Sequence, residues 1–274
     1  MTAPTADAYT APVTPPRKLE DRVALVTGGG RGIGRAIALA FAREGAHVAL
    51  AARTPADLEA VAAEVQALGR KAVALPTDLG ERAQVDAAAR AVSEALGPVG
   101  ILVNGAGVAV SAKLTDTDDL LWERHLRVNL TGAFYASRAA LPGMLAQGWG
   151  RIINVASSAA RQGYPYVAAY VASKHGLLGL TRALALEVVQ SGVTVNAICP
   201  GYVASEMTWE SARRIQAKTG RSYEEAVRSL AAFSPQRRLI EPDEVAALAV
   251  LLAGDEARGV TAQAWGVDGG AVQA

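Results

Sequence analysis

The fold of this chain is decided at residues 23–43, which read VALVTGGGRGIGRAIALAFAR. The first five residues are apolar or β-branched and predict a short buried strand. The glycines that follow predict a tight turn, and the alanine-rich stretch from Gly34 to Arg43 predicts a helix. A strand that passes through a glycine-rich turn into a helix is how a parallel β-α-β unit begins.

The same alternation of short apolar runs and alanine-rich stretches continues from Asp21 toward the end of the chain. It predicts one α/β domain over residues 21–274, a doubly wound parallel sheet with helices on both faces. Helices such as Gly34–Arg43 and Thr54–Leu68, the second capped by Thr54, are expected between the strands. The seven expected strands are Val23–Val26, His47–Ala51, Ala72–Leu75, Ile101–Asn104, Ile152–Val155, Thr194–Ile198 and Ala264–Val267.

Composition narrows the class of protein. The chain has 274 residues and a net charge of +1, with 51% hydrophobic and 19% charged residues, so neither disorder nor a nucleic-acid partner is expected. No stretch approaches the roughly 20 apolar residues that span a bilayer. The single cysteine, Cys199, allows no internal disulfide. We expect a cytoplasmic, soluble protein with no metal site and no membrane partner.

Two segments break the alternating pattern. Residues 1–20 are rich in Thr, Ala and Pro and lack the apolar segment of a signal peptide, so a flexible tail is expected. Residues 202–240 separate the sixth strand from the seventh, and they contain a helix start of their own, the capping box SYEE at residues 222–225. We expect this second segment to form a lid over the substrate.

The turn after the first strand reads TGGGRGIG at residues 27–34. Its spacing, Gly28-x3-Gly32-x-Gly34, differs from the G-x-G-x-x-G form of dinucleotide-binding folds. The free N–H groups and positive dipole end of the helix that follows can nevertheless bind a pyrophosphate. We therefore predict a dinucleotide site; a turn that only tightens strand-to-helix packing is the alternative.

The end of the second strand indicates which dinucleotide. An acidic residue there would accept the ribose 2′-hydroxyl of NAD, but this strand runs into Arg53. Arg53 offers a planar, bidentate donor to a 2′-phosphate, and Arg31 in the glycine turn can close on it from the other side. NADP(H) is therefore favoured over NAD(H), although Asp57 argues against it and both arginines could be solvated surface charges.

Asp78 follows the third expected strand and allows two interpretations. Its carboxylate can accept a hydrogen bond from the adenine amino group of the cofactor. It can equally cap a helix over Gly80–Ala95. The sequence leaves both open.

Tyr170 and Lys174 stand four residues apart in the segment YVASK. On a helix this spacing places both side chains on one face, about one turn apart. A tyrosine with an ordinary pKa of about 10 is a poor acid or base at neutral pH, and a nearby lysine charge favours the phenolate. The pair therefore predicts a tyrosine whose pKa is lowered and which can exchange a proton with a substrate.

Several motifs occur together in an order that resembles the short-chain dehydrogenase/reductase family. The resemblance spans about residues 22–270 and is carried by the glycine turn, Asn104-Gly105-Ala106-Gly107, Asn129, Ser157, Tyr170, Lys174 and Pro200-Gly201. It implies a Rossmann fold and NAD(P)-dependent chemistry between a ketone and an alcohol. The catalytic residues that it implies are Asn129, Ser157, Tyr170 and Lys174, with Ser158 as the alternative to Ser157.

In the roles that the resemblance implies, Ser157 hydrogen-bonds the substrate carbonyl and Tyr170 gives it a proton as hydride arrives. Lys174 also holds the nicotinamide ribose, and Asn129 holds a relay water. Taken singly, Ser157 could merely end a strand and Asn129 could merely cap a helix that begins near Thr131. All four in order favour catalysis.

The resemblance also implies the contacts to the cofactor. Two positions depart from the family pattern. Gly105 lacks the side-chain amide that braces the central sheet, and Ser205 stands where threonine is common but keeps a hydroxyl that can reach the nicotinamide carboxamide. We expect lower local rigidity and intact cofactor binding. The expected contacts are Gly28, Arg31, Gly32, Ile33, Gly34, Arg53, Asp78, Leu79, Asn104, Ala106, Gly107, Tyr170, Lys174, Pro200, Gly201, Val203 and Ser205.

The substrate is less well defined, because the chain is similar both to polyketide ketoreductases and to 3-hydroxybutyrate dehydrogenases. No carboxylate anchor such as histidine follows Ser157, where residues 158–160 read SAA, which argues mildly against a small hydroxy acid. Residues 108–110, VAV, do not match the proline-glycine-rich segment of aromatic polyketide reductases. We expect a ketoreductase for a 3-oxoacyl or cyclic ketone substrate. The seven Arg or Lys and four Glu of the lid also allow a thioester carrier.

Two other functions remain compatible with parts of the sequence. An NAD-dependent 3-hydroxy acid or alcohol dehydrogenase is the first alternative, and a non-catalytic nucleotide-binding sensor is the second. A serine hydrolase lacks its G-x-S-x-G motif, and His47, His125 and His175 stand in no suggestive context. By resemblance we expect a homotetramer.

Overall fold

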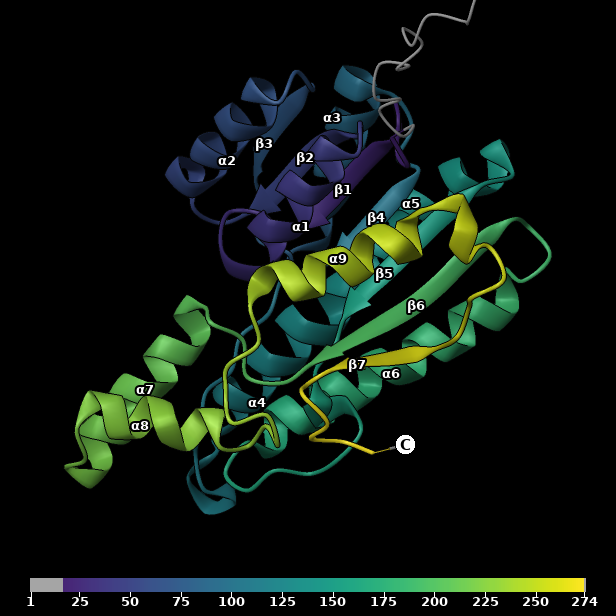
Figure 1. Cartoon of the computed structure of the whole chain (residues 1–274). Helices are drawn as coiled ribbons and strands as arrows, with labels where there is room; N and C mark the ends of the chain where they lie inside the picture. Colours follow the sequence, from purple (N-terminus) through teal and green to yellow (C-terminus); the bar gives the residue numbers. More distant parts are fainter. Residues whose placement is uncertain (1–16, 274) are drawn as a thin grey trace, which may run out of the picture.

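The computed structural model describes residues 17–273, which form one sheet flanked by helices (Figure 1). All seven strands are parallel, in the order β3-β2-β1-β4-β5-β6-β7. The predicted strands are confirmed, and five of them run one to three residues further than expected. Their bounds are β1 Val23–Thr27, β2 His47–Ala52, β3 Ala72–Pro76, β4 Ile101–Asn104, β5 Gly150–Val155, β6 Val193–Pro200 and β7 Ala264–Val267.

The helices lie on both faces of the sheet, as predicted (Figure 1). Successive residues of a strand point to opposite faces, so Ala24 and Val26 pack with α1, α2 and α9, whereas Val23 and Leu25 pack with α3, α5 and α6. This alternation gives the molecule two apolar layers around one sheet. The main helices are α1 Gly32–Arg43, α2 Pro55–Ala67, α3 Arg82–Leu96, α4 Asp119–Leu126, α5 Gly132–Gln147, α6 Ala168–Glu187, α7 Glu206–Thr219, α8 Tyr223–Ala231 and α9 Pro242–Ala253.

Three local expectations need correction. Thr54 precedes α2 but its side chain makes no capping hydrogen bond. Helix α3 begins at Arg82 after Glu81, so Asp78 is not its cap. Residues 1–16 of the expected tail lie outside the described residues, and Leu19 belongs to the folded domain because it is 1% exposed and its amide donates to the Glu44 carbonyl, 2.9 Å away.

The segment after β6 forms a separate pair of helices, α7 and α8, at one end of the molecule (Figure 1). The pair has a small apolar core of its own, in which Ala212 of α7 packs with Ala226 and Leu230 of α8. The predicted capping box is present, since Ser222 and Glu225 bond each other's backbone N–H groups. Within residues 17–273, no helix is both long and apolar enough to cross a membrane.

Candidate active site

The glycine turn places the start of α1 at the carboxyl end of β1. Gly28 has a φ of +70°, and a Cβ there would lie 2.8 Å from the Ala106 amide nitrogen. A Cβ on Gly34 would overlap the Gly28 carbonyl oxygen. Glycine is therefore needed for packing at both positions. Helix α1 has no side-chain cap at Arg31, which leaves its first N–H groups free for an anion.

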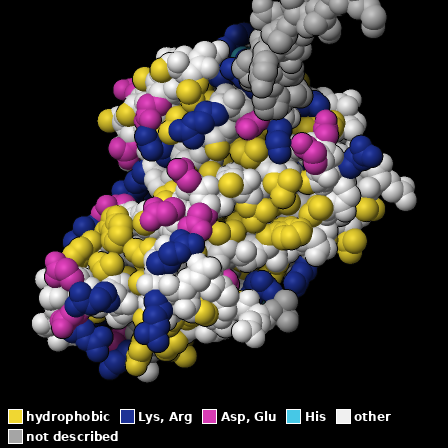
Figure 2. All heavy atoms as spheres, viewed as in Figure 1, with side chains coloured by type: hydrophobic (Ala, Val, Ile, Leu, Met, Phe, Trp, Pro, Cys, Tyr) yellow, Lys and Arg dark blue, Asp and Glu magenta, His cyan; other side chains and the backbone are white. Residues whose placement is uncertain are grey.

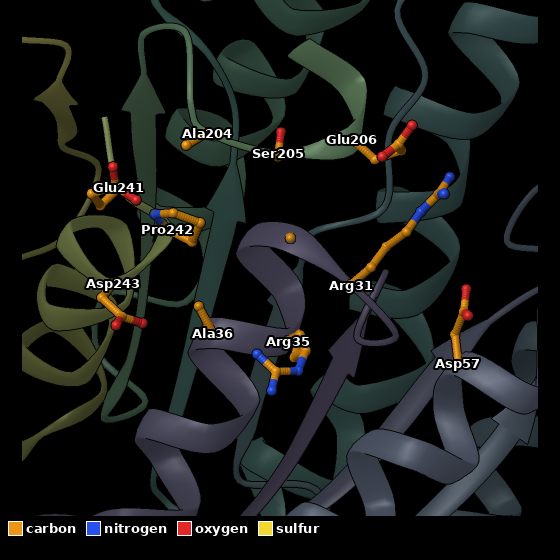
Figure 3. Close-up of a pocket in the computed structure, with 11 residues that line it drawn as sticks. Arg31, Arg35, Ala36, Asp57, Ala204, Ser205, Glu206, Glu241, Pro242 and Asp243 are labelled. Atoms are coloured by element: carbon orange, nitrogen blue, oxygen red, sulfur yellow. The ribbon is translucent and has the colours of Figure 1, made fainter. Parts of the chain in front are cut away.

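Arg31 and Arg53 are both exposed beside this turn, and neither forms a salt bridge within the described part of the chain. Arg31 lines a cavity of about 590 Å³ between α1, α2 and the starts of α7 and α9. Figure 3 shows its guanidinium group extending toward Glu206 of α7, with Asp57 of α2 on its other side. Arg31 can meet a phosphate in this cavity, whereas Arg53 is not among its lining residues, and Asp57 and Glu206 add negative charge to the lining.

The strand ends beside the turn are linked by polar side chains. Asn104 donates from Nδ2 to Asn154 Oδ1 at 2.8 Å, and Asn154 donates in turn to Thr181 Oγ1 at 2.8 Å. The Gly105 amide donates to Thr27 Oγ1 at 3.1 Å, and a Cβ at Gly105 would lie 2.8 Å from the Thr27 carbonyl oxygen. Thr27 therefore holds the Gly105 backbone close to β1, and the expected loss of rigidity at Gly105 stays a prediction.

Asn129 is 1% exposed and lies in a π-helical turn, Arg127–Thr131, that joins α4 to α5. Its Oδ1 accepts from the Val108 amide at 2.8 Å, while its Nδ2 donates to the Val108 carbonyl at 3.0 Å and to Ser173 Oγ at 2.9 Å. The helix-cap alternative is wrong, because these bonds go to the loop after β4 and to α6. Asn129 thus ties that loop to the helix that carries Tyr170.

Helix α6 brings Tyr170 and Lys174 to the end of β5, where Ser157 follows the strand. Ser157 Oγ accepts from the Ala159 amide at 3.1 Å, and Lys174 Nζ donates to the Val155 carbonyl at 2.8 Å. The Lys174 ammonium lies 5.8 Å from the centre of the Tyr170 ring. All three side chains therefore meet at one point, next to Asn129.

The electrostatics differ from the sequence argument. Burial raises the pKa of Tyr170, and a hydrogen bond with Ser157 opposes the rise. Burial lowers the pKa of Lys174 to about 8. The predicted fall in the Tyr170 pKa is wrong, because burial raises this pKa and Lys174 donates to the Val155 carbonyl rather than to the phenol. Tyr170 is thereby kept protonated, as a proton donor must be.

Above these residues lies a cavity of about 700 Å³, which Ser157, Ser158 and Tyr170 line from below. Aromatic rings form much of its wall, with Phe233 packed against Tyr164 at 5.9 Å and against Tyr202 at 5.3 Å between ring centres. Tyr164 donates to Ser158 Oγ at 3.1 Å, which leaves Ser157 as the serine bonded to Tyr170. Three cations, Lys113, Arg214 and Lys218, also line the cavity.

The remaining predicted contacts fall into two groups. Ile33, Pro200, Gly201, Val203 and Ser205 line the large cavity beside Tyr170. Asp78 and Leu79 follow β3: Asp78 Oδ1 accepts from the Gly80 amide at 2.9 Å, and Leu79 is buried. The structure thus brings the predicted catalytic residues together with the turn after β6, and it leaves their roles and the adenine contact of Asp78 as predictions.

The model of the family described as "short chain dehydrogenase" matches residues 22–216. This chain belongs to the short chain dehydrogenase family. A D-beta-hydroxybutyrate dehydrogenase of Rhizobium meliloti (strain 1021) is 40% identical over 253 residues, which cover 91% of this chain and 98% of that protein. As a member of this family, the chain is an oxidoreductase with the fold and chemistry that its motifs predicted.

Two solved structures of the same family resemble this one closely. A variant of actinorhodin polyketide ketoreductase with NADPH has a TM-score of 0.88 and 39% identity, and it is matched over 91% of this chain and 97% of its own. The L-sorbose reductase of Gluconobacter frateurii, complexed with NADPH and L-sorbose, has a TM-score of 0.89 and 31% identity. The match covers 94% of this chain and 99% of the reductase. The relatives therefore span reductases and a dehydrogenase.

Two side chains near the site were missed by reasoning from the sequence. His125 is fully buried, and it bonds the loop after β4 at the Val110 amide. Arg214 of α7 donates to the Ala109 carbonyl at 3.1 Å. The one available signal was that His125 stands four residues before Asn129, a spacing that puts both on the same side of a helix.

Proposed function

We propose that this short chain dehydrogenase is an NADP(H)-dependent ketoreductase that acts on a bulky ketone, either cyclic or 3-oxoacyl. The observation that carries the proposal is the cavity of about 700 Å³, walled by aromatic rings, with Tyr170 and Ser157 at its base. A four-carbon hydroxy acid would leave most of that volume unfilled. Burial of a large apolar substrate against the rings would supply binding energy.

The geometry supports a role for each of the four predicted catalytic residues. Ser157 orients the carbonyl oxygen by a hydrogen bond, and neutral Tyr170 donates its proton to that oxygen during reduction. Lys174 supplies positive charge that stabilises the phenolate left behind. Asn129 holds the loop after β4 and, with Lys174, forms the path by which a relay water returns the proton. NADPH, when bound, supplies the hydride.

The residues around the glycine turn and the end of β2 suit NADP(H). The glycine cradle and the uncapped start of α1 suit a pyrophosphate, and Arg31 and Arg53 suit a 2′-phosphate. The two solved relatives with NADPH support the same choice. NAD(H) is the alternative, which Asp57 beside Gly30 favours, since a Cβ on that glycine would lie 3.0 Å from the Asp57 Cβ.

A second candidate is an NAD-dependent 3-hydroxy acid dehydrogenase, favoured by the 40% identical hydroxybutyrate enzyme. Lys113, Arg214 and Lys218 at the large cavity could hold its carboxylate. The same cations suit the phosphate groups of a thioester carrier. Cavity size favours the ketoreductase over the hydroxy acid enzyme.

The test is absorbance of the reduced nicotinamide with NADPH or NADH against 1-decalone, acetoacetyl coenzyme A and acetoacetate, with Tyr170→Phe as control. We expect NADPH oxidation with the bicyclic ketone or the thioester and none in Tyr170→Phe. Faster turnover of acetoacetate with NADH would favour the hydroxy acid dehydrogenase. NADPH binding without turnover of any probe would favour the sensor.

We also propose that the protein is a cytoplasmic homotetramer. Large apolar side chains stand exposed on α5, α6, α9 and β7, and Figure 2 shows hydrophobic side chains gathered over the region of α9. The exposed apolar side chains on these four elements include Phe134, Leu186, Leu251 and Trp265, which are between 40% and 69% exposed. Light scattering coupled to size exclusion tests the assembly, and a monomeric mass contradicts it.

A further inference from the structure

His125 is held in one protonation state by its two ring nitrogens. Nδ1 lies 2.7 Å from the Leu121 carbonyl oxygen, which can only accept, so Nδ1 carries the proton. Nε2 then has a lone pair and accepts from the Val110 amide at 3.1 Å. Burial and the nearby Arg124 lower the pKa of His125, which is 0% exposed. The neutral ring satisfies every polar atom that it presents.

The Val110 amide belongs to the loop after β4, which forms one wall of the large cavity. Asn129 holds Val108 of this loop at both its amide and its carbonyl, and His125 holds Val110. Ala109 and Ser111 alternate with these two residues and line the cavity. The side of the loop that faces the substrate is therefore set by bonds on its opposite side.

His125 also touches the residue that donates the proton. Its ring meets the Tyr170 ring edge to face, with centres 6.5 Å apart and planes at 78°. One side chain thus contacts both the loop wall and the side of the phenol. Asn129 does not contact the Tyr170 ring in this way, although it bonds Ser173 of the same helix.

We propose that His125 is a positioning residue for the reaction: its Nε2 fixes the loop after β4 at Val110, and its ring supports Tyr170. The inference rests on the proposed function, in which Tyr170 is the proton donor beside a bulky ketone. The acceptor at Nε2 is the essential part, because a partly buried Val110 amide that lost this acceptor would turn toward water and pull the loop away from α4. The contact with the ring adds orientation.

Two variants separate these parts. His125→Gln keeps an oxygen that can accept from the Val110 amide but lacks a ring, whereas His125→Phe keeps a ring and lacks an acceptor. His175→Phe is the matched control, since His175 is exposed on α6 and, among the described residues, bonds only its own helix, at the Val171 carbonyl. Thermal unfolding of each variant confirms that it is folded.

With 1-decalone and NADPH, we expect kcat/KM for the ketone to fall about 10-fold in His125→Phe, as loss of one buried hydrogen bond and a displaced wall predict. His125→Gln should retain most of the activity, His175→Phe should match the wild type, and the KM for NADPH should be unchanged in all three. Equal losses in the Gln and Phe variants would overturn the proposal.

Hydrogen exchange gives a readout that does not depend on turnover. Peptides that span residues 105–114 should exchange faster in His125→Phe than in the wild type, and at nearly the wild-type rate in His125→Gln. An unchanged exchange rate of residues 105–114 in His125→Phe would contradict the proposal. If the wild type reduces none of the probe ketones, the proposed function fails, while the exchange rates still decide whether His125 holds the loop.

Discussion

The base of the large cavity and the helices α7 and α8 differ in how firmly they are held. Asn129 and Lys174 at the base are 1% and 4% exposed, and each is bonded to backbone groups of other elements. The α7–α8 pair buries few residues, and Figure 2 shows its surface dotted with Lys and Arg side chains. The base therefore has the fixed geometry that the proposed chemistry needs, whereas we expect the loosely packed pair to adapt to the substrate.

Tyr170→Phe should give the largest effect and so test the base most directly. Removing the phenol hydroxyl removes the proton donor but keeps the ring against His125, so kcat should fall about 1,000-fold with NADPH affinity near the wild type. Steady-state rates with 1-decalone and fluorescence titration with NADPH measure the two quantities. A fall below tenfold would mean that another group donates the proton.

The cofactor arginines should give the next largest effect. Arg31→Ala combined with Arg53→Ala removes two charge-assisted contacts to a 2′-phosphate, so the KM for NADPH should rise about 10- to 100-fold and that for NADH should stay constant. Arg35→Ala is the control, because Arg35 lines the same cavity (Figure 3) but is paired with Glu64. A parallel rise in the KM for NADH would refute the cofactor assignment.

These predictions rest on what the sequence could specify. Strands such as Ile101–Asn104 were found because a buried parallel strand is a short apolar run bounded by turns. The residues proposed as catalytic could be named because their order and spacing along the chain are visible in the sequence, and the structure places them together. The bonds of His125 and Arg214 were not found, since their partners are backbone groups whose approach depends on tertiary packing. The predicted direction of the Tyr170 pKa shift was wrong for a similar reason, because the burial that raises this pKa also depends on tertiary packing.

Lys174 should make the base sensitive to alkaline pH. Its pKa is lowered to about 8 from an ordinary 10.5, so activity should fall as the pH rises through about 8 and the ammonium loses its proton. Between about pH 8 and 10.5 the Lys174 side chain of the unfolded chain still holds its proton, whereas that of the folded protein has lost it. The free energy of unfolding therefore rises with pH over this range. The pH dependence of kcat and of the melting temperature, each compared between the wild type and Lys174→Met, tests the predicted fall in activity and the predicted rise in stability. An alkaline limb that persists unchanged in residual Lys174→Met activity would exclude Lys174 as its cause.

The smallest effect should come from the aromatic wall, where Phe233 follows α8 and stands 47% exposed. Phe233→Ala removes its contacts with the Tyr164 and Tyr202 rings, each worth about 0.5–1.5 kcal/mol. We expect the KM for 1-decalone to rise about fivefold and the melting temperature to fall by a few degrees, with little change in kcat, because the ring shapes the wall without touching Tyr170.

Acetoacetate provides the comparison within the same variant, since a small ketone that reaches Tyr170 without filling the wall should keep its KM in Phe233→Ala. An equal rise for both ketones would mean that Phe233 holds the cavity as a whole. The division between a fixed base and an adaptable α7–α8 pair would then be too sharp, because a change at the end of α8 would have reached Ser157 and Tyr170. A selective rise places the choice of substrate at the α7–α8 end of the cavity and the chemistry at its base, where α6 carries Tyr170 and Lys174.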